Sequence, residues 1–194
     1  MGFVDLNNGS GGPSSSGYGE VPTPLYRHLD TNGDGTGDKS AIGDYSSTPG
    51  IYYIQPGPNE IFRISRMMVL LSGKATSMKT DTYGSVPALT NGVVVRVQND
   101  SGTIIELTDG VPLKTNGCWG RVAFDSVLYD STSDSDSYLR VRWTFEKGGY
   151  PIRLDGSKNE RLEVYLSDDM TDGGSTDAMQ KQYFFAHGYI ENTT

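Results

Sequence analysis

The stretch SYLRVRWTFEKGGYPIRLDGSKNERLEVYLSDD, residues 137–169, decides the fold. Apolar side chains fall at every second position from Leu139 to Phe145 and again from Leu162 to Leu166. Successive side chains of a β-strand point to opposite faces of a sheet, so this alternation buries one face and exposes the other to water. Glycines in the two segments between the apolar runs suit chain reversals. The stretch therefore predicts three strands joined by turns.

The same alternation predicts further strands over 50–55, 60–71, 93–98, 103–108, 119–128 and 183–190. After Arg66 the pattern changes from alternating to continuous, which indicates either burial on both faces or a β-bulge. A short helical turn is expected near residues 177–179. About eight strands without a convincing helix predict an antiparallel all-β domain, either a sandwich or a barrel.

Composition and charge limit the range of partners. The chain has 194 residues, with 24 acidic against 16 basic side chains and a formal net charge of −8. This charge repels phosphate backbones and anionic lipids, so we expect neither a nucleic-acid partner nor a membrane partner. Cys118 is the only cysteine. The chain therefore forms no intrachain disulfide, which fits synthesis in a reducing cytoplasm.

The amino-terminal segment is poor in groups that can pack. Residues 7–19 are almost entirely Asn, Gly, Ser and Pro, with Tyr18 as the only aromatic residue, and Phe3, Val4 and Leu6 form a small apolar tip before them. Such a segment cannot offset the entropy lost on ordering. Two interpretations stand at even weight: a frayed terminus, or a flexible arm whose tip binds a neighbouring subunit.

The remaining chain divides by composition. Three segments are predicted: a flexible arm over 1–24, an Asp/Gly-rich connecting segment over 25–49, and a β-sandwich body over 50–194.

The connecting segment contains an Asp-rich loop that begins like a calcium loop. Asp30, Asn32, Asp34 and Asp38 supply oxygen side chains at loop positions 1, 3, 5 and 9, the spacing of an EF-hand. Position 12 is Ala41 in place of the bidentate glutamate, and prolines rather than helices flank the loop. We therefore favour a tight turn, in which the side chains bond their own backbone, over a structural calcium site.

No catalytic signature is present. The sequence contains no nucleophile elbow, no P-loop, no dinucleotide-binding pattern and no zinc-protease motif. His187 lies in a predicted strand rich in aromatic residues, which favours a structural role over a catalytic one. We interpret Cys118 as a small buried side chain and not as a nucleophile. Asp168 and Asp169 form a carboxylate pair, but their position after a strand favours a turn over a glycosidase site. We therefore expect a protein that is not an enzyme and carries no cofactor.

The body resembles the auxiliary capsid proteins, also called cement or decoration proteins, of tailed bacteriophages. The resemblance rests on six segments: His28–Gly35, Ile64–Met67, Leu89–Gly92, Arg142–Phe145, Leu154–Gly156 and Leu166–Asp169. It implies a jelly-roll-like antiparallel β-sandwich with a flexible amino-terminal arm. It also implies a homotrimer or homodimer on the virion's outer capsid surface, bound to the major capsid protein and stabilising contacts between its subunits. In that role Phe3, Val4, Leu6 and Tyr18 would form the capsid-binding arm.

Two other functions remain open. The first is a carbohydrate-binding β-sandwich for host recognition, with calcium at the Asp-rich loop and loop tyrosines stacking on sugars. The second, ranked last, is a small glycan-cleaving enzyme that uses a carboxylate pair.

Overall fold

The computed structural model describes residues 22–74, 90–107, 124–129, 136–145, 151–171 and 179–192. Within these ranges the chain forms ten β-strands and one short 3-10 helix, η2 (Gly156–Lys158). Within the described ranges, no helix is long and apolar enough to cross a lipid bilayer.

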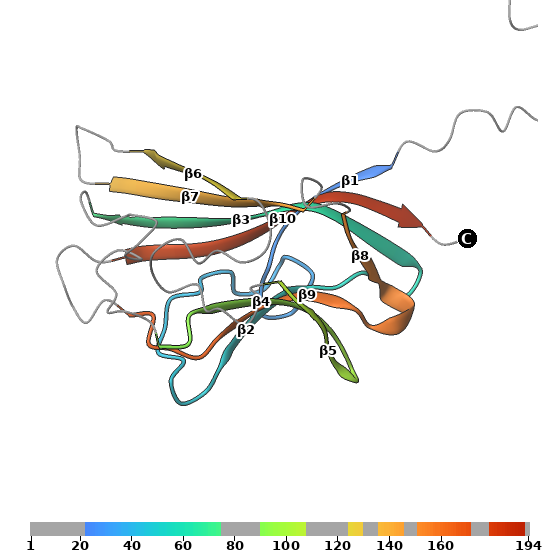
Figure 1. Ribbon diagram of the computed structural model, residues 1–194, viewed down its shortest axis with the longest axis horizontal. Coiled ribbons are helices and arrows are strands. Elements are labelled where there is room, and N and C mark those ends of the chain that lie inside the picture. The colour runs from blue at the N-terminus through green and yellow to red at the C-terminus, as the bar shows by residue number, and fades with distance from the viewer. Residues whose placement is uncertain are drawn as a thin grey trace, which may run out of the picture.

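The strands form two antiparallel sheets that pack face to face (Figure 1). The first sheet has the order β1 (Thr23–His28), β10 (Met179–Asn192), β3 (Glu60–Lys74), β7 (Asp136–Thr144) and β6 (Phe124–Tyr129), and β8 (Ile152–Asp155) also pairs with β3. The second has the order β2 (Gly50–Ile54), β9 (Arg161–Leu166), β4 (Val93–Asn99) and β5 (Gly102–Glu106).

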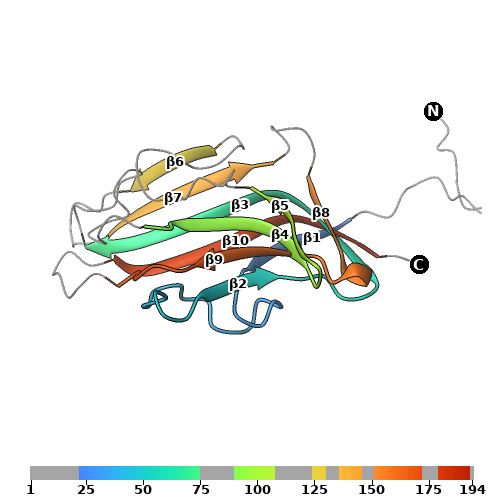
Figure 2. The same cartoon turned by 60° about the horizontal axis from the view of Figure 1, so that its bottom comes forward.

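This strand order is that of a jelly roll. The chain crosses from one sheet to the other between β1 and β2, again between β2 and β3, and again between β3 and β4. It crosses in the same manner from β8 to β9 and from β9 to β10 (Figure 2). Such crossings between two antiparallel sheets define the jelly-roll architecture. The predicted antiparallel β-sandwich of jelly-roll type is therefore confirmed.

The core lies between the sheets and takes buried side chains from β1–β4 and β7–β10, whereas no residue of β5 is buried. In β9, for example, Leu162, Val164 and Leu166 are fully buried, as the alternation in the sequence predicts. The largest side chains that are fully buried are Phe62, Phe184, Leu29, Ile54, Ile64, Met67, Leu154 and Leu162. Burial of one such side chain stabilises the fold by about 1.5–3 kcal/mol.

A β-bulge explains the change of pattern near Arg66. Arg66 pairs with His187, but the next residue of β10, Gly188, pairs with Ile64, so Ser65 is an extra residue on β3. Beyond the bulge, Met67 and Val69 are buried between the sheets. Of the two explanations offered by the sequence, the bulge is confirmed.

The sandwich begins earlier than the sequence predicts. Residues 25–49 are predicted as a connecting segment, but Thr23–His28 is strand β1 and pairs along its length with β10. Leu25, Leu29 and Ala41 belong to the hydrophobic core. The predicted helical turn over 177–179 is wrong at Met179, which begins β10. Residues 177 and 178 lie outside the described ranges.

Candidate functional site

Asp30 organises the Asp-rich loop from its centre. Its carboxylate is fully buried. Oδ1 accepts a hydrogen bond of 2.7 Å from the backbone N–H of Gly33, and Oδ2 accepts one of 2.6 Å from that of Gly37. The backbone of Asp30 also exchanges two hydrogen bonds with Tyr53 of β2. A buried carboxylate is tolerated when N–H groups compensate its lost hydration, so Asp30 folds the loop around itself and fixes it to the second sheet.

The other three predicted oxygen ligands also accept hydrogen bonds from nearby backbone. Asn32 Oδ1 accepts from Asp34 N, Asp34 Oδ1 accepts from Thr36 N, and Asp38 Oδ1 accepts from Ser40 N, in each case two residues onward. These are the hydrogen bonds of the tight turns that the sequence favours. The hydroxyl and N–H of Thr36 also lower the pKa of Asp34.

The loop does not gather its carboxylates around one centre. Among the described residues, no group of three or more His, Cys, Asp or Glu side chains could together hold a metal ion. Calcium binding at Asp30, Asn32, Asp34 and Asp38 stays a prediction.

The far end of the loop is fixed by a pair of tyrosines. The Tyr52 hydroxyl donates a hydrogen bond of 2.8 Å to the backbone carbonyl of Ser40 and lies 2.7 Å from the hydroxyl of Tyr45. Burial raises the pKa of both tyrosines, so both hydroxyls stay protonated at neutral pH. Asp30 at one end and Tyr52 at the other therefore hold residues 37–40 in place.

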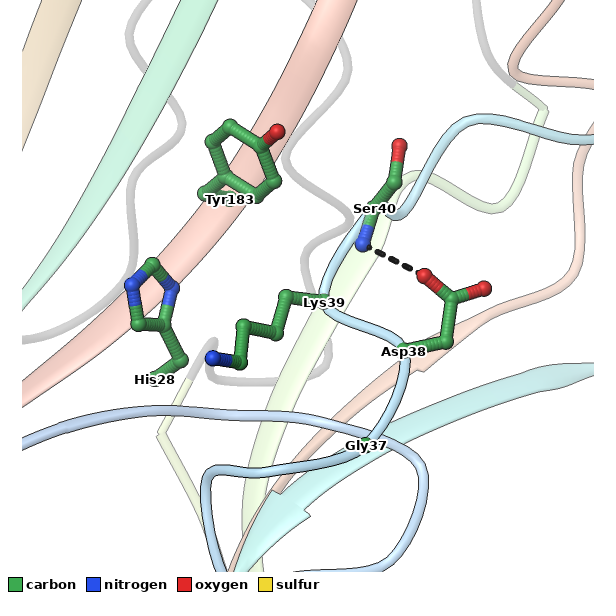
Figure 3. Close-up of a pocket in the computed structure, with 6 residues that line it drawn as sticks. All are labelled: His28, Gly37, Asp38, Lys39, Ser40 and Tyr183. Atoms are coloured by element: carbon green, nitrogen blue, oxygen red, sulfur yellow. Dashed lines mark hydrogen bonds between the residues drawn. The ribbon is translucent and has the colours of Figure 1, made fainter.

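The fixed segment forms one wall of an open pocket at the edge of the first sheet. The pocket has a volume of about 530 Å³ and is lined by His28, Gly37, Asp38, Lys39, Ser40 and Tyr183. His28 ends β1, and Tyr183 lies on the neighbouring strand β10. Their rings meet edge to face at a centroid distance of 5.8 Å. Figure 3 shows the Lys39 side chain extending toward the imidazole of His28.

Several polar groups of this pocket have no partner within the described part of the chain. The Lys39 ammonium has no ion-pair partner, and the Tyr183 and Ser40 hydroxyls have no hydrogen-bond partner. The Nδ1 atom of His28 is buried and also has none. Burial and the nearby Lys39 lower the pKa of His28, although Asp30 acts in the opposite direction. At neutral pH the pocket therefore offers a neutral imidazole, one cation and two hydroxyls.

The other candidates from the sequence have structural contacts. Asp168, which follows β9, accepts backbone hydrogen bonds from Thr90, Asn91 and Gly92, and so anchors the segment that leads into β4. Asp169 Oδ1 accepts from the N–H and the hydroxyl of Thr171. Both carboxylates serve turns in this structure, as their position after a strand predicts.

His187 lies on β10, on the face of the first sheet that points away from the core. The ring of Tyr26 meets the ring of His187 at a centroid distance of 4.5 Å. Burial, together with Arg66 and Arg142, lowers the pKa of His187. Phe3, Val4, Leu6, Tyr18 and Cys118 lie outside the described residues.

The sequence does not point to Lys39 or Tyr183 as site residues. Lys39 is adjacent to the predicted metal ligand Asp38, but nothing in the sequence pairs it with a residue of the last strand. The nearness of the loop to Tyr183 depends on the register of β1 against β10, which places His28 opposite Phe185 and close to Tyr183.

Comparison with known proteins finds no matching family model, no similar curated protein and no similar solved structure.

The two histidines predict a loss of stability in mild acid. Both have a pKa below the ordinary histidine value of about 6.5 in the folded protein, so the unfolded chain takes up protons first as the pH falls through 6.5. Their contribution to the free energy of unfolding is therefore fully present above pH 6.5. As the pH falls below 6.5 this contribution decreases, until the pH has passed the pKa values of the two histidines in the folded protein. The groups that face them are Asp30 and Lys39 for His28, and Arg66 and Arg142 for His187.

Urea unfolding between pH 7.5 and 5 measures this effect. We expect the double variant His28→Gln/His187→Gln to lose clearly less stability over this interval than the unmodified chain. Carboxylates with lowered pKa values, such as Asp34 and Asp44, titrate below the interval and do not interfere. An unchanged pH slope in the double variant would show that other groups cause the acid sensitivity.

Proposed function

We propose that this chain is a structural virion protein: a cement protein that binds the outer surface of a phage head and stabilises contacts between major capsid subunits. In this role it is neither an enzyme nor a nucleic-acid-binding protein, and it acts as a homotrimer or homodimer. The sequence resemblance described above and the jelly-roll body support this proposal, because jelly rolls recur in viral capsid and lectin domains. A fold by itself does not define a function.

The position of β1 is the observation that carries the proposal. Within the described chain, β1 pairs with β10 on one side only, so it forms an edge of the first sheet. Thr23, where β1 begins, therefore lies at a sheet edge, at the same end where β10 finishes (Figure 2). An extended segment that leaves from such an edge reaches a neighbouring subunit and gains main-chain hydrogen bonds by adding to its sheet.

The exposed apolar side chains support binding through sheet edges. The large hydrophobic side chains that are exposed in the described structure are Tyr26 (58%), Ile51 (40%), Ile104 (46%) and Ile105 (50%). They lie on β1, β2 and β5, each at an edge of a sheet. Exposed edges with apolar side chains favour association with another chain. Several small contact areas suit a protein seated between many copies of a capsid subunit.

The charge favours the outside of the head. A net charge of −8 opposes contact with the packaged DNA and therefore with the inner surface of the shell.

Co-sedimentation with phage heads tests the proposal. The purified chain is mixed with heads of the phage that encodes it, after the native protein has been stripped from them. A second sample lacks residues 1–21, which leaves β1 complete. We expect the full chain to bind saturably and the truncated chain to bind at least about tenfold more weakly, because the arm contributes through effective concentration. Both should melt at the same temperature.

The triple variant Phe3→Ser/Val4→Ser/Leu6→Ser is the matched control for arm length, and we expect it to bind as weakly as the truncated chain. Failure of the full chain to bind the heads would refute the proposal. Equal binding by the full and truncated chains would refute the role of the arm.

A further inference from the structure

The pocket between β1, β10 and the Asp-rich loop has the chemistry of a ligand site. It brings together the Lys39 ammonium and the Tyr183 and Ser40 hydroxyls, for which the described chain supplies no partner. Buried polar atoms in native proteins are normally paired, so the buried Nδ1 of His28, which has no partner in the described chain, indicates that a bound molecule supplies its partner. The wall that carries Lys39 and Ser40 is held by Asp30 and Tyr52, so the site is largely preformed.

The arrangement favours one class of ligand. A carboxylate is the natural partner for an unpaired ammonium beside a neutral imidazole. The Asp38 carboxylate accepts a hydrogen bond from Ser40 N and lies on the side of the loop away from the Lys39 side chain (Figure 3). The Ser40 and Tyr183 hydroxyls can pair with the hydroxyl groups of a sugar. The rings of Tyr183 and His28 add flat apolar surface of the kind that packs against sugar rings.

We propose that this pocket binds an acidic saccharide, with the sugar carboxylate on Lys39 and sugar hydroxyls on Ser40 and Tyr183. The volume of about 530 Å³ accommodates one or two sugar units. The site lies in the body of the protein and uses no residue of the arm. It therefore goes beyond capsid attachment, and it gives the protein a means to recognise acidic glycans that does not depend on calcium at the Asp-rich loop.

Binding is measured by NMR titration of the full-length protein with glucuronate, using the imidazole signals of His28 as the reporter. We expect saturable shifts with a dissociation constant on the order of 1 mM, as is typical of a ligand of this size. The bound carboxylate should also raise the pKa of His28, because it introduces a negative charge beside Lys39. Glucose, acetate and a hexaglutamate peptide are the comparison ligands, and each should bind at least about tenfold more weakly than glucuronate.

Two variants test the assigned contacts. Lys39→Met keeps the apolar stem and should weaken glucuronate binding at least about tenfold, with the melting temperature unchanged. Tyr183→Phe removes only a hydroxyl and should weaken it several-fold. Lys158→Met is the matched control, since Lys158 has 62% of its side chain exposed and lies outside the pocket, and it should bind normally.

Other outcomes would overturn the assignment. Equal binding of acetate would make the pocket a simple anion site, and equal binding of hexaglutamate would make it a peptide site. Equal binding of glucose, undiminished binding by Lys39→Met, or no shift with glucuronate would remove the acidic-sugar site altogether. All of these results are independent of whether the protein binds phage heads.

Discussion

Replacing Gly188 by alanine is expected to lower the free energy of unfolding by about 3 kcal/mol or more. Gly188 sits at the bulge between β10 and β3, where the two backbones approach closely. A Cβ atom at this position would lie 1.8 Å from the carbonyl oxygen of Arg63 and 2.8 Å from its carbonyl carbon. Both are backbone atoms of the central strand, so no side-chain rotation relieves the clash. The two longest strands must separate instead.

Thermal and urea unfolding measure this effect. For a domain of this size, the loss corresponds to a fall in melting temperature of roughly 6–12 °C. Gly57→Ala is the control, because its Cβ would meet first the end of the flexible Glu60 side chain, at 3.2 Å. This control should change the free energy of unfolding by less than about 1 kcal/mol. If Gly188→Ala is as stable as the control, the bulge register of β3 against β10 is wrong.

Replacing Glu163 by glutamine is expected to cost about 3 kcal/mol of stability, because it removes one member of a buried ionic group. Glu163 lies on β9, and its side chain is fully buried. Oε1 accepts a hydrogen bond of 2.9 Å from Arg96 Nε, and Oε2 accepts one of 3.0 Å from Arg161 Nε. Glutamine keeps the shape but loses the charge, so two mostly buried guanidinium groups lose their counter-charge.

The matched control is Glu191→Gln. Glu191 pairs with Arg63 at 3.2 Å, but both side chains are about one third exposed. Solvent screens such a pair, so the substitution should cost less than about 1 kcal/mol. Chemical denaturation of the three proteins at the same pH compares the two effects. Equal losses for Glu163→Gln and Glu191→Gln would contradict the ionic role assigned to Glu163.

Alternation in the sequence predicts the strands whose two faces differ. In β9 the prediction over 162–166 agrees with the observed strand to within one residue, because buried aliphatic side chains alternate with polar ones. The hairpin of β4 and β5 is predicted by the alternation in β4 and by its turn at Gly102, whose φ is 122°, whereas Ile104 and Ile105 of β5 are both exposed. Even the bulge leaves a trace in the sequence, since an extra residue shifts the alternation after Arg66.

The first strand does not follow this rule. Only Leu25 is buried among its six residues, and Pro24 favours an irregular segment over a strand. Proline is tolerated because β1 is an edge strand, where the missing N–H is not needed for pairing. The information that makes this segment a strand resides in β10, which supplies the complementary edge, and is not contained in the segment itself.

The candidate pocket is predictable only in part. Asn-Gly and Asp-Gly pairs predict the tight turns of the Asp-rich loop, and the structure contains the corresponding hydrogen bonds. Oxygen spacing alone suggests a metal, because sequence does not tell which oxygens are already bonded to the backbone. That Lys39, His28 and Tyr183 line one pocket depends on the register of β1 and on the path of the loop, which arise only in the folded chain.

Electron cryomicroscopy of phage heads incubated with this chain tests the proposed capsid role. We expect a jelly-roll body on the outer surface between major capsid subunits, with density for residues 1–21 running from β1 onto a neighbouring subunit. Heads that carry no such body, or that carry it on the inner surface, would contradict the claim.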